Sequence, residues 1–228
     1  MIIEKNLSYM NTNHHMAFDY IKKILNEKSD CRILDIGAGA NPWAMDYLTH
    51  IIDVFVEPND VDKFYEKNIQ VFNFDIQDSN NWTEVLLEVE KYGKFDFVIC
   101  SHTLEDLNNP EVVCRLINKI GKAGFISMPS KYAELMVFEN KNNLPYVGFH
   151  HHRWIYNIKN NILIGTPKMV FHNSIQYNNP PQSYFFSEIA FVWENDFDFK
   201  FLEPHQLLDN RTGSNQIFEI LEQDDLNF

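Results

Sequence analysis

Short apolar runs alternate along the chain with stretches in which apolar residues recur every three or four positions. The short runs predict strands, and the helically spaced stretches predict helices. Helix-length segments between strands imply right-handed crossovers, and therefore an α/β fold with a doubly wound parallel sheet. The predicted strands are Ile33–Ile36, Ile51–Glu57, Gln70–Phe74, Phe95–Cys100 and Gly124–Met128. The predicted helices include Met16–Glu27, which follows a polar start of the chain, Pro42–Leu48 and a helix opened by Pro110 and closed by Gly121.

After the fifth strand the pattern changes. Residues at every second position fall on one face of an extended chain, Ile189, Phe191 and Trp193 in one segment and Phe197, Phe199 and Phe201 in the next. With the turn Asn195-Asp196 between them, the segments 189–194 and 197–202 predict a C-terminal β-hairpin. The insertion that precedes it, residues 129–184, contains a predicted helix at 131–138. It also contains a predicted small hairpin, with strands at 153–158 and 162–166.

The segment from Cys31 to Pro42 joins the first buried strand to a glycine turn. Gly37 and Gly39 allow the chain to turn tightly and let a ligand approach the backbone closely. Asn41 and Pro42 resemble the cap and first residue of a helix. A strand, a glycine turn and a helix start together predict a corner that binds a nucleotide-type ligand.

Two acids make this corner more specific. Asp35 precedes Gly37 at the carboxyl end of the strand, where ligands of open α/β sheets bind. A carboxylate there can hold an ammonium group but would repel a pyrophosphate, and the third glycine of the dinucleotide fingerprint is absent. Glu57 ends the second strand, in a position to accept hydrogen bonds from ribose hydroxyls. These features describe a site for S-adenosylmethionine.

At this point the sequence resembles the class I S-adenosylmethionine-dependent methyltransferases, over residues 30–130. Residues 73–78 are similar to the family's motif after the third strand, which implies that Asp75 and Ile76 meet the adenine. Residues 95–105 are similar to the fourth strand and its loop, which implies that Ser101 and His102 lie beside the cofactor. The resemblance implies a seven-stranded, mostly parallel sheet, with the C-terminal hairpin as its antiparallel sixth and seventh strands. The implied cofactor-binding residues are Asp35, Gly37, Gly39, Asn41, Glu57, Asp75, Ile76, Ser101 and His102.

The chain of 228 residues is expected to form one methyltransferase-like domain. The domain is expected to contain five segments in chain order: an N-terminal helical segment, a cofactor-binding core, a substrate-binding or lid insertion, a terminal hairpin and a tail. Their ranges are 1–29, 30–128, 129–184, 185–203 and 204–228.

The insertion carries the sequence His150-His151-His152-Arg153-Trp154. Histidine is matched to proton removal near neutral pH, so His150, His152 and the fold-placed His102 are candidate catalytic bases. Arg153 can hold an anionic group of the substrate, and Trp154 can stack on a sugar. A metal site completed by His102 or Glu134 is another interpretation, and a structural or solvated cluster is a third. Of these interpretations, the metal site is not adopted, and no residue is predicted to be a metal ligand.

The composition limits the kinds of partner that the protein is expected to bind. The net charge is −13, and no Lys/Arg cluster is present, which argues against nucleic acid as the substrate. No apolar run reaches the length of a membrane span, and the first residues lack the apolar core of a signal peptide, so we expect a cytoplasmic protein without a membrane partner.

The favoured function is therefore an S-adenosylmethionine-dependent methyltransferase that acts on a small-molecule or glycan-type acceptor, at oxygen. Methyl transfer depends largely on alignment of donor and acceptor, so no universal catalytic residue marks it in the sequence. One alternative is a non-catalytic S-adenosylmethionine-binding protein. Another is a dinucleotide-dependent oxidoreductase, against which Asp35 and the missing third glycine both count.

Overall fold

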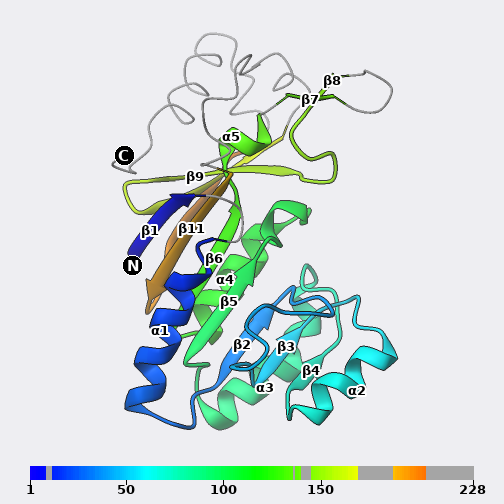
Figure 1. Cartoon of the computed structure of the whole chain (residues 1–228), viewed down its shortest axis with the longest axis vertical. Coiled ribbons are helices and arrows are strands. Elements are labelled where there is room, and N and C mark those ends of the chain that lie inside the picture. The colour runs from blue at the N-terminus through cyan, green and yellow to red at the C-terminus, as the bar shows by residue number, and fades with distance from the viewer. Residues whose placement is uncertain (9–11, 136, 140–144, 169–186, 204–228) are drawn as a thin grey trace.

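The computed structural model of the chain describes residues 1–8, 12–135, 137–139, 145–168 and 187–203. A seven-stranded sheet forms its centre (Figure 1). In spatial order its strands are β1 (Ile2–Ser8), β11 (Glu188–Glu194), β6 (Ala123–Pro129), β5 (Phe97–Ser101), β2 (Ile33–Ile36), β3 (His50–Ile52) and β4 (Gln70–Phe72). Strands β2 to β6 run parallel, whereas β11 is antiparallel to both of its neighbours. The predicted α/β fold with a mostly parallel seven-stranded sheet is confirmed.

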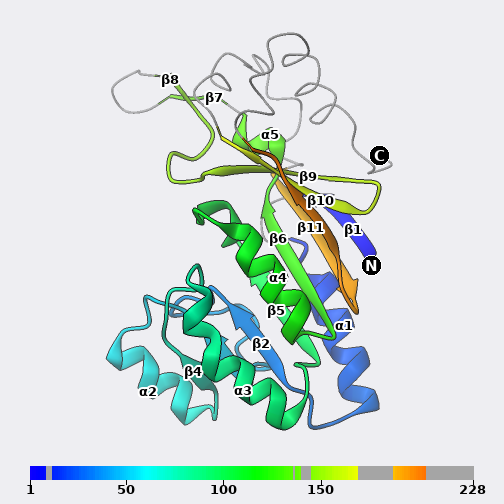
Figure 2. The same ribbon diagram turned by 180° about the vertical axis from the view of Figure 1, so that it is seen from behind.

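Helices cover both faces of this sheet. They are α1 (His14–Glu27), α2 (Pro58–Glu66), α3 (Thr83–Tyr92) and α4 (Pro110–Ile120), with short 3₁₀ turns η1 (Ser79–Trp82) and η2 (Leu104–Asp106). Consecutive strand residues point to opposite faces. Ile33 therefore packs in one core cluster with α1 and α2, and Leu34 in the other with α3 and α4. Figure 2 shows α3 and α4 in front of the sheet.

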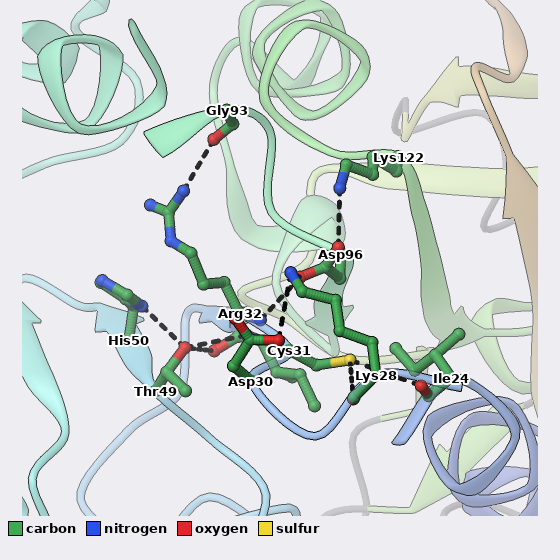
Figure 3. Close-up of polar contacts among 11 residues, drawn as sticks. Ile24, Lys28, Asp30, Cys31, Arg32, Thr49, His50, Gly93, Asp96 and Lys122 are labelled. Atoms are coloured by element: carbon green, nitrogen blue, oxygen red, sulfur yellow. Dashed lines mark hydrogen bonds and ion pairs between the residues drawn. The ribbon is translucent and has the colours of Figure 1, made fainter. Parts of the chain in front are cut away.

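Asp96, the one polar residue in the predicted strand Phe95–Cys100, fastens the amino-terminal ends of three strands (Figure 3). Its carboxylate accepts hydrogen bonds from the Arg32 backbone N–H at 2.8 Å, from Lys122 Nζ at 2.7 Å and from Lys28 Nζ at 3.2 Å. Burial alone would raise the pKa of Asp96, but these hydrogen bonds outweigh it and lower the pKa. Because Arg32 precedes β2 and Lys122 precedes β6, Asp96 aligns these strands with β5 at the edge opposite their carboxyl ends.

The first residues of the chain form a strand, β1, where the sequence suggested only a polar lead-in to a helix. β1 pairs with β11 and closes one edge of the sheet. The pairing register shifts between Ile2 and Glu4, so the buried residues Ile2 and Leu7 are not separated by an even number of positions. The apolar alternation that marks a strand is therefore missing from this sequence.

The two strands predicted at residues 189–202 are both present, but they do not pair with each other. β11 enters the main sheet, whereas β12 (Asp198–Phe201) runs parallel to β10 (Ile162–Pro167) in a separate three-stranded sheet. β10 also pairs with β9 (Trp154–Lys159), which confirms the predicted small hairpin. This second sheet lies across the ends of β6 and β11 (Figure 1). The edge position expected for the hairpin is thus taken by β1.

Two local predictions around the glycine turn are wrong. Residues 42–48 form turns instead of a helix, with hydrogen bonds from Met45 N–H to the Pro42 carbonyl at 3.2 Å. The strand predicted to reach Glu57 ends at Ile52. It ends there because the Asp53 carboxylate accepts the Phe55 backbone N–H at 2.7 Å, which bends the chain.

The insertion departs from its prediction too. The predicted helix at 131–138 is the single turn α5 (Lys131–Glu134), followed by β7 (Val137–Glu139), which pairs with β8 (Pro145–Val147). The tail 204–228 and the part of the insertion at 169–184 lie outside the described residues. Among the described helices, none has the length and apolar character needed to cross a membrane.

Replacing Trp193 should test the junction between the two sheets. The side chain is fully buried in β11 and contacts Phe197, with ring centroids 5.4 Å apart. Trp193→Ala should lower the free energy of unfolding by about 3–5 kcal/mol, because it leaves a large cavity. Tyr65→Ala, at a residue that is 80% exposed, should change it by less than about 0.5 kcal/mol. Denaturant unfolding followed by circular dichroism measures both, and equal losses would contradict the packing described.

Candidate functional site

A cavity of about 460 Å³ opens at the carboxyl ends of β2, β3, β4 and β5. This edge is where open α/β sheets bind ligands. The volume falls within the roughly 300–1,000 Å³ typical of small-molecule sites. Its lining residues are Gly37, Ile52, Asp53, Val54, Phe55, Phe74, Asp75, Ile76, Gln77, His102, Thr103, Asp106 and Leu107.

The glycine turn forms one wall of the cavity. Gly37 has φ +73°, and its N–H donates to the Ile52 carbonyl at 2.8 Å. A Cβ at this position would lie 2.2 Å from Oγ1 of Thr103, so a larger residue does not fit. Gly39 has φ +61°, but a Cβ there would meet no atom within 4 Å. The turn therefore exposes backbone to the cavity at Gly37, as predicted, although no helix follows it.

Of the two acids after β3, Asp53 lines the cavity and Glu57 does not. Oδ2 of Asp53 accepts the Gly39 N–H at 2.8 Å, and the side chain is buried. Glu57 is exposed and precedes α2 as its N-terminal cap residue. The prediction of Glu57 depends on a strand that reaches residue 57, whereas β3 ends at Ile52. An acid directly after Ile51-Ile52 was the available signal for Asp53.

The other predicted cofactor residues divide into two groups. Asp75 and Ile76 line the cavity. Asp35 is buried inside β2 and does not line the cavity, and Asn41 is exposed and accepts a hydrogen bond from Lys63. Ser101 ends β5, where its hydroxyl lies 2.8 Å from that of Ser127.

The buried position of Asp35 has an electrostatic consequence. Burial, and secondarily the negative charge of Asp53, raise the pKa of Asp35 well above its usual value. A cation brought to this end of the cavity would relieve that repulsion.

His102 lies on the opposite wall, in a left-handed backbone conformation with φ +50°. Its Nε2 lies 2.8 Å from Oε1 of Glu188, and its Nδ1 lies 3.4 Å from Oε1 of Glu105. Both glutamates are almost fully buried. A carboxylate only accepts hydrogen bonds, so Nε2 carries a proton. Asn13 completes the group by donating to Oε2 of Glu188 at 2.7 Å.

This environment fixes the charge of His102. Burial on its own would lower the pKa of the imidazole, but the carboxylates of Glu105 and Glu188 outweigh it and raise the pKa to about 9. An imidazolium cannot accept a proton. At neutral pH His102 is therefore a positively charged hydrogen-bond donor, which disagrees with the predicted role of a base.

The histidines of the insertion do not act as one group. His150 and His151 are exposed, whereas His152 is buried and its Nδ1 donates to Glu134. The Nε2 atoms of His151 and His152 lie 3.9 and 3.8 Å from Oδ1 of Asp106, which lines the cavity. Asp106 and Glu188 were absent from the predicted site, because neither belongs to a recognisable motif.

The predicted substrate residues Arg153 and Trp154 contact the loop after β5. Arg153 donates from its backbone N–H to the Glu105 carbonyl at 2.7 Å and from Nε to the Asp106 carbonyl at 3.2 Å. Trp154 donates from Nε1 to the Leu107 carbonyl at 2.8 Å and packs on Phe201. These contacts position the loop that carries His102 and Asp106.

Residues 9–158, about two thirds of the chain, match the sequence family described as a methyltransferase domain. The chain belongs to this methyltransferase family. Its methyl donor is S-adenosylmethionine, and the cavity suits such a donor, with the backbone of Gly37, apolar side chains and carboxylates in its wall. The match decides against the oxidoreductase alternative. No curated protein is detectably similar to the methyltransferase in sequence.

Several solved structures are similar to this chain. The Thermoplasma acidophilum 1320 protein is 10% identical, with 82% of this chain and 91% of that chain covered and a TM-score of 0.40. A putative ribosomal RNA methyltransferase from Plasmodium falciparum is 14% identical, with 83% and 100% covered and a TM-score of 0.41. CalS10, an amino pentose methyltransferase from Micromonospora echinaspora, is 16% identical, with 52% and 51% covered and a TM-score of 0.34. At these identities and TM-scores, the solved structures add nothing to the family assignment, which rests on the sequence-family match.

The two turn glycines should respond differently to alanine. Gly37→Ala adds both left-handed strain and an overlap with Thr103, whereas Gly39→Ala adds only the strain, about 1–2 kcal/mol. Gly37→Ala should therefore cost more unfolding free energy than Gly39→Ala. Adding Thr103→Ala to Gly37→Ala should recover part of that difference. Chemical denaturation measures it, and identical losses in both single variants would contradict the close approach at Gly37.

The charge of His102 can be measured by histidine NMR. Its imidazole should titrate near pH 9, with the signal assigned by its loss in His102→Asn, because Asn tolerates a left-handed conformation. Glu188→Gln should lower this pKa. Since folding raises the pKa, the stabilisation is complete below about pH 6.5 and is lost as the pH rises to 9. The stability difference between the parent and His102→Asn should shrink over that range, and a constant difference would count against the ion pair.

Proposed function

We propose that this methyltransferase methylates a hydroxyl oxygen of a small molecule or sugar unit, with donor and acceptor at opposite ends of the cavity. The observation that carries the proposal is the division of the cavity wall. The glycine turn and the segments after β3 and β4 form one part of the wall, and the loop 102–107, which packs against the glycine turn through Thr103, forms the other part.

The donor fits the first part. Phe55 is 82% exposed although it lines the cavity, and a bound adenine would cover it together with Val54 and Ile76. Asp53, which lines the cavity and already accepts the Gly39 and Phe55 N–H groups, would accept hydrogen bonds from ribose hydroxyls with its remaining lone pairs. The methionine part would pass the backbone of Gly37, which lines the cavity, near Gly39, where a Cβ would meet no atom within 4 Å. Its ammonium group would relieve the repulsion around Asp35. When bound, the donor supplies an electrophilic methyl group on a sulfonium.

The second part suits a neutral, hydroxyl-rich acceptor. Asp106 in the loop 102–107 and Asp75, which follows β4 beside the donor part, both line the cavity and offer acceptors for hydroxyl protons. The same carboxylates, on a protein with a net charge of −13, repel phosphates and therefore disfavour nucleic acid. Charged His102, whose two ring nitrogens face Glu188 and Glu105, would place a positive charge beside the acceptor oxygen. Loss of the hydroxyl proton would be favoured at the edge formed by Asp106, His151 and His152.

Donor binding distinguishes Asp53 from Glu57. Asp53→Ala should weaken S-adenosylmethionine binding about tenfold or more, because hydrogen bonds to a charged group contribute roughly 1.5–3 kcal/mol. Glu57→Ala, at an acid outside the cavity, should leave the affinity within about twofold. Isothermal titration calorimetry measures both, with thermal unfolding as a check that Asp53→Ala is folded. The reverse order of effects would move the ribose to Glu57.

The acceptor class is tested by release of S-adenosylhomocysteine. Sugars, nucleotide sugars and small phenols should yield product, and transfer RNA and duplex DNA should not. Transfer to RNA with none to the hydroxyl compounds would overturn the proposed acceptor while leaving the donor site intact.

A further inference from the structure

Three side chains converge at the acceptor end of the cavity: Asp106 from η2, and His151 and His152 from the segment before β9. One ligating atom from each lies within 4.8 Å of the other two. Both histidines present Nε2 to Oδ1 of Asp106, at 3.9 and 3.8 Å. These separations exceed a hydrogen bond, so the contact between the three groups leaves space at its centre.

His152 is oriented toward that space by groups behind it. Its Nδ1 donates to Oε1 of Glu134, and Oε2 of Glu134 accepts from Lys168 Nζ at 2.6 Å. Glu134 is fully buried. No hydrogen bond to another described residue occupies Nε2 of His152. In metal-ligating histidines, a carboxylate commonly accepts the N–H of one ring nitrogen while the other ring nitrogen binds the metal.

The backbone around the cluster is also fixed. Gly148 has φ +62°, and a Cβ there would lie 2.2 Å from the Glu134 carbonyl oxygen, so this segment is pressed against α5. The Arg153 N–H donates to the Glu105 carbonyl at 2.7 Å, which ties the segment to η2. The ligating side chains thus come from two segments joined by main-chain contacts, which is a suitable support for a preorganised site.

We propose that Asp106, His151 and His152 bind one divalent transition-metal ion of the Zn²⁺ type. Two imidazoles and one carboxylate suit zinc, cobalt, nickel or ferrous iron better than magnesium, which prefers oxygen ligands. Ligand atoms around a tetrahedral zinc are about 3.3 Å apart. The present separations close to that value by small rotations of the exposed side chains of His151 and Asp106.

The site would keep one coordination position for the acceptor, since three protein ligands leave a fourth position open and Asp106 borders the cavity. This role rests on the proposed function. In methyl transfer to a hydroxyl, a carbon–oxygen bond forms as the carbon–sulfur bond breaks, the bonding pair returns to sulfur, and the hydroxyl proton passes to solvent water at this exposed edge. A cation on the oxygen favours that loss by lowering the hydroxyl pKa.

Metal binding is tested without any acceptor, on tag-free full-length protein treated with chelator. Titration with Co²⁺ should give visible absorption bands that saturate at one equivalent, and Zn²⁺ should displace the Co²⁺. Calorimetry should show one zinc ion bound and no comparable binding of Mg²⁺. Absence of a saturable one-equivalent signal would overturn the proposed site.

Variants distinguish Zn²⁺ binding at this cluster from non-specific Zn²⁺ binding by exposed histidines. Asp106→Asn and His151→Ala should each weaken Zn²⁺ binding at least tenfold, whereas His150→Ala, the adjacent exposed histidine, should leave it within twofold. Glu134→Gln should weaken it about 10–100-fold through His152. Circular dichroism establishes that each variant is folded. Equal affinity in Asp106→Asn, His151→Ala and His150→Ala would show surface binding only and refute the assignment.

The same preparations distinguish the two proposals. If zinc binds at this cluster but no hydroxyl compound is methylated, the metal site stands and the proposed acceptor fails. If hydroxyl compounds are methylated at the same rate with and without chelator, the metal does not assist the reaction. S-adenosylmethionine affinity should be unchanged by zinc, because the donor lies at the other end of the cavity.

Discussion

The ion pair between His102 and Glu188 is the constraint on which the arrangement of the site depends. Glu188 is fully buried at the start of β11, and a buried carboxylate without a partner is strongly destabilising. His102 and Asn13 satisfy it from the loop after β5 and from the residue before α1. Three segments that are distant in sequence therefore meet at one carboxylate. This contact also stabilises the left-handed conformation that presents His102 to the cavity.

The loop that begins at His102 is held on its other side by the small sheet. The carbonyl groups of Leu104, Glu105 and Leu107 accept hydrogen bonds from Tyr156, Arg153 and Trp154 respectively. Residues that the sequence marks as substrate contacts thus serve first to position the loop. A wall fixed from both sides suits methyl transfer, in which the alignment of donor and acceptor supplies much of the rate.

The sequence predicted what is local and periodic. The mostly parallel sheet, the glycine turn that reaches the cavity at Gly37 and the position of Asp75 and Ile76 in the cavity wall follow from motifs and from apolar patterns. What it missed depends on pairing between distant segments or on one side chain that redirects the chain. β12 has the alternation of a hairpin strand but pairs with β10, and Asp53 bends the backbone after β3 and so replaces Glu57 at the cavity.

The remaining property of the site is its excess of negative charge, which no single motif announces. Burial, and secondarily the negative charge of Asp53, raise the pKa of Asp35, and Glu105 and Glu188 are buried on the opposite wall. His102 carries a charge because these two glutamates hold its proton. The field that results favours a cationic ligand such as a sulfonium with an ammonium group, and it disfavours the pyrophosphate of a dinucleotide. The charges around this glycine turn therefore favour binding of a methyl donor over the nucleotide cofactors that similar glycine turns bind.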